Sequence, residues 1–195
     1  AEDAGLIAQI GEWVLREACT QKRRWEDAGL PPLAVSVNLS ARQFRDESLA
    51  RMVSEILSET GLAPGNLEME LTESMVMHDA EIAIATLQGL KSLAVQVSVD
   101  DFGVGYSSLS YLKRLPIGTL KIDASFVHDI NAGDDPEDGI IAKAVISLGH
   151  SLHLKVVAEG VETDAQLKFL KANGCDEAQG YFLAHPLPPQ ECEQL

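Results

Sequence analysis

Six short apolar segments alternate along the chain with longer segments whose apolar residues recur at helical spacing. The short segments have four to seven residues and are rich in Val, Ile and Leu, which is typical of buried β-strands. They are Leu33–Leu39, Leu67–Leu71, Val95–Asp100, Thr119–Ile122, Lys155–Ala158 and Ala178–Phe182. Because strand and helix alternate throughout, the sequence predicts an α/β fold with a parallel sheet.

Polar residues are assigned to the carboxyl ends of these strands. They are Asn38, Glu70, Asp100 with Asp101, Lys121, Glu159 and Gln179. In folds of this kind, ligands bind at the carboxyl ends of the strands. Successive end residues lie 20 to 38 positions apart, about 28 on average, and an eight-unit barrel of about 250 residues repeats about every 31 residues. The spacing predicts a TIM-like (β/α) barrel with six units in this chain, and we expect its first strands to be absent.

Helix-start signals support the alternation of strands and helices. Ser40 with Gln43, and Thr163 with Gln166, match the capping-box pattern. Asp135-Pro136 combines an N-cap residue with a proline at the first helical position. These signals predict helices that begin near residues 41, 136 and 164.

The composition excludes several classes of function. A formal charge of −15 and a pI of about 4.6 argue against binding a nucleic-acid duplex, which needs basic phosphate contacts. A small phosphate ligand stays open, because bound metals reverse the local field. Cys19, Cys175 and Cys192 are widely separated, which argues against a disulfide framework and favours a reducing compartment, the cytoplasm. No apolar run reaches the roughly 18 residues of a membrane span, so we expect no membrane contact by this domain.

Asp100 and Asp101 stand side by side where an apolar strand ends and a glycine-rich turn begins. Two unit charges about 4 Å apart repel by about 4 kcal/mol at an effective dielectric constant near 20. Cations would offset this repulsion, and Mg²⁺ and Mn²⁺ prefer hard oxygen ligands. Asn38 and Glu70 add an amide oxygen and a carboxylate from neighbouring strand ends. The sequence therefore predicts a divalent metal site.

Two cations about 3.5–4 Å apart, bridged by one carboxylate, would form a hydrolytic pair. Lys121 is the one cation among the strand-end residues, and it would hold the attacking water or neutralise charge on a transferring phosphate. Glu159 would either complete the second metal shell or accept a proton from the water. The sequence does not separate these two roles of Glu159.

Each of these residues also has a simpler interpretation. The aspartate pair fits a solvated strand end with a helix cap, and Asn38 fits turn chemistry. Glu70 and Glu73 fit a charged first helical turn, which the helix dipole favours. Glu159 fits a turn before Gly160, and the role of Gln179 is the least specific of the set. Lys121 fits an exposed lysine less well, because its apolar neighbours indicate a buried strand, in which an unpaired lysine is costly.

Six motifs in order carry a family resemblance. They are Val37-Asn38-Leu39-Ser40, Glu70-Leu71-Thr72-Glu73-Ser74, Asp100-Asp101-Phe102-Gly103-Val104-Gly105-Tyr106-Ser107-Ser108, Leu120-Lys121-Ile122-Asp123, Ala158-Glu159-Gly160-Val161-Glu162 and Gln179-Gly180-Tyr181. Together they resemble the EAL-domain family of bacterial cyclic di-GMP phosphodiesterases. Each motif alone is weak, but the ordered set covers essentially the whole chain and is highly specific.

The resemblance implies a role for each matching residue. Asn38, Glu70 and Asp100 would bind a first Mg²⁺ or Mn²⁺, and Asp100 would bridge to a second ion near Asp101 and Glu159. Lys121 would position the water, Gln179 would line the substrate pocket, and Glu73 would support the loop 101–108, which in this family couples the site to a homodimer interface. The implied reaction is hydrolysis of cyclic di-GMP to linear pGpG, with inhibition by Ca²⁺.

One departure from the family pattern leaves an alternative open. The Glu-Ala-Leu motif that names the family does not occur here, and its glutamate is a metal ligand in the family. We expect residues 1–195 to form a single EAL-type domain without its N-terminal segment, in a longer protein that can carry sensor or GGDEF domains. The alternative is a catalytically degenerate domain that binds cyclic di-GMP as a sensor, or an interaction domain. The retained carboxylates favour the enzyme.

Overall fold

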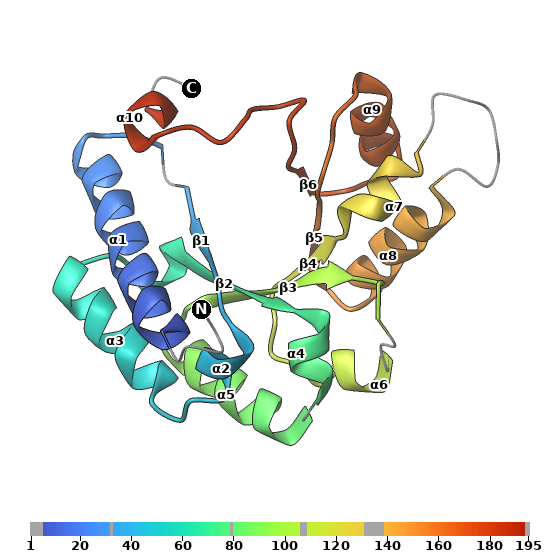
Figure 1. Cartoon of the computed structure of the whole chain (residues 1–195). Coiled ribbons are helices and arrows are strands. Elements are labelled where there is room, and N and C mark those ends of the chain that lie inside the picture. Colours follow the sequence, from blue (N-terminus) through green and yellow to red (C-terminus); the bar gives the residue numbers. More distant parts are fainter. Residues whose placement is uncertain (1–5, 32, 79, 106–108, 131–138, 194–195) are drawn as a thin grey trace.

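A six-stranded parallel sheet forms the centre of the molecule (Figure 1). The computed structural model describes residues 6–31, 33–78, 80–105, 109–130 and 139–193. The strands are β1 (Val35–Asn38), β2 (Leu67–Thr72), β3 (Gln96–Phe102), β4 (Thr119–Ile122), β5 (Lys155–Ala158) and β6 (Glu177–Ala178), in spatial order β1-β2-β3-β4-β5-β6. All five neighbouring pairs are parallel. The sheet curls into a half barrel, so the predicted TIM-like α/β fold is confirmed.

Helices lie between successive strands, before the first strand and after the last, and the longer ones lie on the outside of the curled sheet (Figure 1). They are α1 (Ile7–Asp27), α2 (Ala41–Phe44), α3 (Leu49–Thr60), η1 (Pro64–Asn66), α4 (Glu73–His78), α5 (Ala80–Ser92), α6 (Leu109–Leu112), α7 (Ala124–His128), α8 (Ile140–Ser151), α9 (Asp164–Ala172) and α10 (Pro189–Cys192). With 21 residues, α1 is the longest helix among the described residues. None of the predicted site residues lies on it.

The two faces of the sheet differ in chemistry because side chains alternate along each strand. One face is apolar and packs against the helices: Val97 and Val99 of β3 are almost fully buried. At Gly149 of α8, an added Cβ would lie 2.4 Å from Val156 of β5, which shows how closely helix and sheet approach. The other face carries Glu70, Ser98 and Lys121, so the interior of the half barrel is polar.

Both capping boxes are confirmed, and the third predicted helix start falls outside the described residues. Ser40 caps α2 and Thr163 caps α9, each through a reciprocal bond with the glutamine three residues later. The described part of α8 begins at Ile140, after Gly139 in a left-handed conformation with φ 64°. Asp135 and Pro136 lie outside the described residues.

The sixth strand is shorter than predicted and shifted towards the N-terminus. It covers Glu177–Ala178 instead of Ala178–Phe182. The backbone turns after Gln179: the amides of Leu183 and Ala184 both donate to the carbonyl of Gly180. These turn bonds replace the sheet bonds that a longer strand would need.

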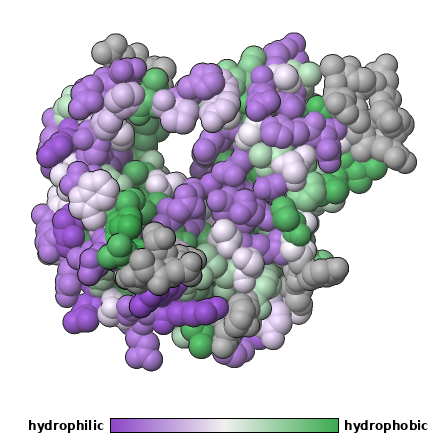
Figure 2. Space-filling model, viewed as in Figure 1, coloured by the Kyte–Doolittle hydropathy of each residue, from purple (hydrophilic) through white to green (hydrophobic). Residues whose placement is uncertain are grey.

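The C-terminal segment crosses from β6 to the α1 side of the molecule (Figure 1). There the indole Nε1 of Trp25 donates a hydrogen bond to Glu193 Oε1 at 3.1 Å. The space-filling view shows a deep hollow beneath this segment, with hydrophilic residues along much of its border (Figure 2). In the described parts of the chain, no helix has the length and apolar character needed to cross a membrane.

Candidate metal centre at the strand ends

The sheet register aligns the predicted site residues along the inner face. Asn38 of β1 is the register partner of Glu70 on β2, and Glu70 is in turn the partner of Ser98 on β3. Lys121 of β4 is the partner of Val157 on β5, two residues before Glu159. Since register partners in a parallel sheet point to the same face, five neighbouring strands direct these side chains to one opening.

Lys121 lies at the centre of the site. Its side chain is 6% exposed, and its Nζ lies 2.8 Å from Glu70 Oε1, 2.5 Å from Glu159 Oε1 and 3.5 Å from Asp100 Oδ1. Burial opposes the charge, but the hydrogen bonds to Glu159 and Glu70 outweigh it and raise the pKa of Lys121 above its ordinary value. Lys121 is therefore a permanent buried cation that three carboxylates share.

A β-bulge turns both aspartates of the pair towards this centre. The β3–β4 register shifts between Val99 and Phe102, so that Asp100 and Asp101 lie opposite the single residue Lys121. Asp101 has φ 53°, a left-handed conformation that aspartate tolerates better than most residues. Its amide donates to Asp100 Oδ1 at 3.0 Å. In a regular strand, consecutive side chains would point to opposite faces, so the bulge makes the shared site.

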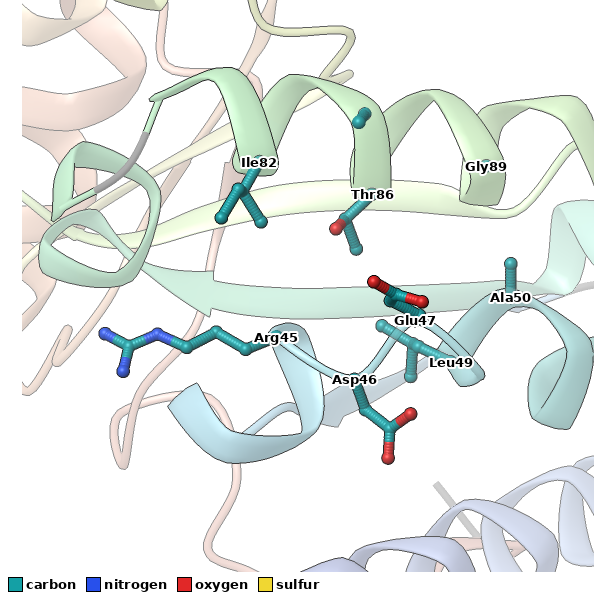
Figure 3. A pocket seen from close by; sticks show the side chains of 9 residues that line it. Arg45, Asp46, Glu47, Leu49, Ala50, Ile82, Thr86 and Gly89 are labelled. Atoms are coloured by element: carbon teal, nitrogen blue, oxygen red, sulfur yellow. The ribbon is translucent and has the colours of Figure 1, made fainter.

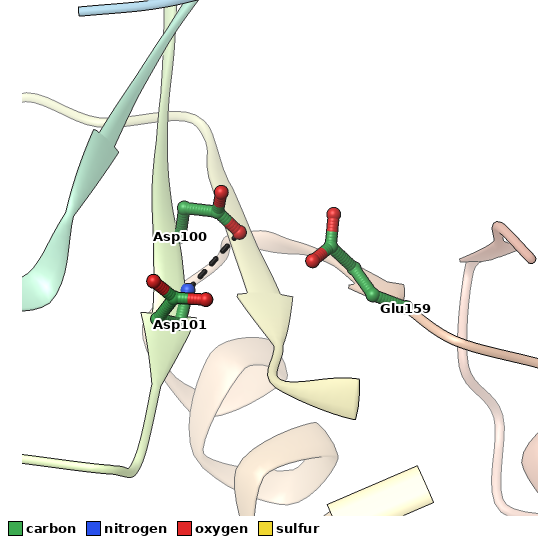
Figure 4. Close-up of side chains that lie close together, drawn as sticks. All are labelled: Asp100, Asp101 and Glu159. Atoms are coloured by element: carbon green, nitrogen blue, oxygen red, sulfur yellow. Dashed lines mark hydrogen bonds between the residues drawn. The ribbon is translucent and has the colours of Figure 1, made fainter. Parts of the chain in front are cut away.

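Asp100, Asp101 and Glu159 converge closely enough to hold one metal ion (Figure 4). One carboxylate oxygen from each lies within 4.8 Å of the other two. Burial raises the pKa of Glu159, and Asp100 and Glu70 raise it further, against the lowering effect of Lys121. Burial also raises the pKa of Asp101, with added repulsion from Asp100. A divalent cation would relieve this repulsion, and the hard oxygen donors suit Mg²⁺, Mn²⁺ or Ca²⁺.

Asp123 belongs to the same cluster, although the sequence patterns assigned it no role. Its charge adds to the effects of burial and of Asp100 that raise the pKa of Asp101, and its carboxylate accepts the amide of Ser125 at 2.9 Å as the N-cap of α7. The hydrogen bond from Ser125 lowers the pKa of Asp123. The sequence signal that could have identified Asp123 was its place directly after a strand and before a helix. Asp123 thus connects the start of α7 to the second aspartate of the site.

Glu73 is buried beneath the turn that follows β3. It is 3% exposed and its Oε2 accepts the amide of Gly103 at 2.8 Å. An added Cβ at Gly105 would lie 2.8 Å from Glu73 Oε1, so this position has no room for a side chain without movement of the glutamate. Glu73 contacts the described part of the loop 101–108, and residues 106–108 lie outside the described residues.

Asn38 and Gln179 occupy the two open edges of the site. Asn38 is exposed at the end of β1, next to Glu70 in the register. Gln179 is exposed directly after β6, and its backbone is fixed by bonds to Ala158 and Val161. Their side chains are therefore near the barrel opening, but neither contacts the cluster around Lys121 by a described hydrogen bond.

A comparison with known families identifies the chain. The model of the EAL domain matches residues 1–186. The chain belongs to the EAL domain family.

Relatives of this EAL domain cover nearly all of it. The chain is 48% identical over 191 residues to the bifunctional diguanylate cyclase/cyclic di-GMP phosphodiesterase MucR of Pseudomonas aeruginosa, covering 98% of this chain and 28% of MucR. It is 46% identical over 195 residues to the cyclic di-GMP phosphodiesterase NbdA of the same organism, covering 100% of this chain and 25% of NbdA. The chain thus spans about a quarter of the length of these curated relatives.

The fold of this EAL domain agrees closely with a solved relative. The structure described as PaMucR phosphodiesterase in complex with c-di-GMP is 47% identical, with a TM-score of 0.93. The match covers 98% of this chain and 77% of that chain. The sequence resemblance to the EAL family is therefore confirmed, and so is the half-barrel architecture.

This EAL domain has a further pocket outside the strand ends. Figure 3 shows it between the segment that joins α2 to α3 and the helix α5. Arg45, Asp46 and Glu47 lie on one side, and Ile82 and Thr86 on the other. The pocket lies at the outer helices α3 and α5, away from the inner face of the sheet. None of its lining residues belongs to the cluster around Lys121.

Proposed function

We propose that this EAL domain hydrolyses one phosphodiester bond of cyclic di-GMP to give linear pGpG, with a pair of Mg²⁺ or Mn²⁺ ions at the strand ends. The observation that carries the proposal is the convergence of Glu70, Asp100 and Glu159 on Lys121. The relatives MucR and NbdA are named cyclic di-GMP phosphodiesterases, which supports the substrate. The three free cysteines support a cytoplasmic location.

The donor set at the strand ends supports a two-ion site. We assign Asn38, Glu70 and Asp100 to a first ion, and Asp100, Asp101 and Glu159 to a second ion. All are oxygen donors from adjacent strands, as Mg²⁺ and Mn²⁺ prefer. When bound, such ions lower the pKa of a bound water and polarise phosphoryl oxygens.

Lys121 is proposed to act on the reacting groups directly. Its raised pKa keeps the ammonium charged, so it donates hydrogen bonds to the attacking water and offsets charge that develops on the phosphoryl oxygens. Water adds to phosphorus as one ester bond to a ribose oxygen breaks, and the proton that the water loses ends on that ribose oxygen. Glu159 lies beside Asp100 and Asp101, which favours a role as metal ligand over a role as base.

We propose that residues 1–195 are one EAL-type domain whose N-terminal segment lies in a longer protein. Among the described residues, β1 pairs only with β2 and β6 only with β5, so both edges of the sheet are open. A segment with further strands between them would close the barrel and add the glutamate of the Glu-Ala-Leu motif. It would also complete a substrate pocket at Gln179. Because MucR is named as bifunctional and is only 28% covered, sensor or GGDEF domains are proposed as further parts.

The test of this function uses the complete natural protein with cyclic di-GMP. With Mn²⁺ or Mg²⁺ we expect conversion to pGpG, measured by liquid chromatography, and with Ca²⁺ no conversion, because the looser coordination of Ca²⁺ fits a close ion pair poorly. Residues 1–195 alone should be far less active, since both sheet edges are open. Unchanged cyclic di-GMP after long incubation with Mn²⁺ would refute the proposal. Binding without turnover would support the sensor alternative instead.

We also propose a homodimer through the loop that follows Asp101. Three large apolar side chains near this loop are exposed: Val104 at 65%, Leu109 at 57% and Tyr111 at 38%. Such exposed apolar residues are typical of protein interfaces. We expect Leu109→Asp to shift the protein from dimer to monomer in analytical ultracentrifugation, with Ile82→Asp, outside the loop, as the control. A wild-type protein that sediments as a monomer at micromolar concentration would contradict the proposal.

A further inference from the structure

Ser98 carries a buried hydroxyl that has no hydrogen-bond partner in the part of the chain that the structure describes. Its side chain is 0% exposed in the middle of β3, and among the described residues its Oγ is the one buried side-chain polar atom without a hydrogen bond. Burying a hydroxyl without a partner costs free energy. Such groups are rare in folded proteins and call for an explanation at each site.

The position of Ser98 relative to the candidate metal centre explains why its hydroxyl is there. Glu70 on β2 and Lys121 on β4 meet at 2.8 Å, although β3 lies between their strands. Two strand spacings amount to about 9.5 Å, so both side chains must lean over β3 to meet. The register partner of Glu70 on β3 is Ser98. On β4 the partner of Ser98 is Thr119, and Lys121 lies two residues further along, opposite the bulge. The ion pair therefore crosses β3 obliquely, from the level of Ser98 on the β2 side to the level of Asp100 on the β4 side.

Small size alone does not account for a serine here. A small side chain leaves room for an ion pair that crosses the strand, but alanine is as small and has no hydroxyl to desolvate. The neighbours on the same strand, Val97 and Val99, point to the helices and are apolar. The hydroxyl thus adds a donor on the inner face at a cost in stability, as expected of a residue that serves a site rather than the fold.

We propose that Ser98 is a positioning residue for Glu70: its hydroxyl donates a hydrogen bond to the Glu70 carboxylate when that carboxylate binds a divalent cation. Glu70 Oε1 accepts a hydrogen bond from Lys121. When the Glu70 carboxylate also binds a cation, a second hydrogen-bond donor is needed to fix the plane of the carboxylate. A hydroxyl rotates freely to supply it. Donors behind a ligating carboxylate orient it and strengthen metal binding. The inference rests on the proposed metal site.

The test measures Mn²⁺ affinity and thermal stability of the complete natural protein and of Ser98→Ala. Isothermal titration calorimetry should show Mn²⁺ binding about tenfold weaker in Ser98→Ala. With cations chelated, the same variant should unfold at the same or a higher temperature, because it loses an unpartnered buried hydroxyl. Ser151→Ala removes an exposed hydroxyl that donates to Ser147 in α8, and it should leave Mn²⁺ affinity unchanged.

The two measurements separate the outcomes. Weaker Mn²⁺ binding at unchanged or higher stability supports the proposal. Equal Mn²⁺ affinity in Ser98→Ala and wild type overturns it while the metal site itself stands. Weaker binding that accompanies a lower unfolding temperature in chelator also overturns it, because Ser98 would then support the fold. A wild-type protein that binds no Mn²⁺ refutes the metal site and this inference together.

Discussion

Replacing Asp100 with asparagine is expected to lower the turnover of cyclic di-GMP by about 10³-fold or more, which corresponds to about 4 kcal/mol of transition-state stabilisation. Asparagine keeps the shape of the side chain and one oxygen, but it removes the negative charge. In our proposal this charge binds both cations. The fold should persist, because the substitution also removes the repulsion between Asp100 and Asp101, which adds to the larger effect of burial in raising the pKa of Asp101. The measurements are single-turnover kinetics with Mn²⁺ and thermal unfolding.

A matched control for this variant is Asp164→Asn. Asp164 is an exposed carboxylate in the first turn of α9 that pairs with Lys168, and it lies outside the site. Asp164→Asn should retain turnover and differ from wild type only slightly in unfolding temperature. Wild-type turnover in Asp100→Asn would remove Asp100 from the mechanism, and loss of the folded state would show that its charge is needed for folding.

The strands were predictable because their signal is local. Each of the first five strands has enough apolar and β-branched residues to identify it, and the structure places all five within two residues of the predicted bounds at either end. The polar inner face follows from simple alternation, because Ser98 and Asp100 alternate along β3 with the apolar Val97 and Val99. The half barrel then follows from the repeated strand–helix order.

The geometry within the site was not predictable, because it depends on pairing between distant strands. Strict alternation would place Asp101 on the face opposite Asp100, and only the β3–β4 register shows the bulge that brings both to Lys121. The same applies to Asp123, whose local sequence signals a helix cap, and to Ser98, whose role depends on contacts made above it by β2 and β4. The predicted bounds of the sixth strand were wrong for another reason. The backbone turns at Gly180 and forms hydrogen bonds within the turn, which apolar content does not reveal.

Lys121→Met should destabilise the domain by about 3–5 kcal/mol at neutral pH with cations chelated, because Glu70, Asp100 and Glu159 lose the buried ammonium that they share. Chemical denaturation monitored by circular dichroism measures the change. Methionine has a similar length, so lost packing contributes little. Lys168→Met, which removes an exposed lysine of α9, is the control and should not measurably change stability.

The pH dependence of Lys121→Met distinguishes lost charge pairing from lost packing. Burial already raises the pKa of Glu159, and Lys121 is the neighbour that lowers it, so the variant should raise this pKa further. A carboxyl whose folded-state pKa lies above its unfolded value stabilises the fold when protonated. The variant should therefore regain stability as pH falls from neutral through that raised pKa, and approach wild type near the unfolded value of about 4.3. A deficit of the same size at pH 5 and pH 7.5 would mean that packing, and not the buried charge, accounts for the loss.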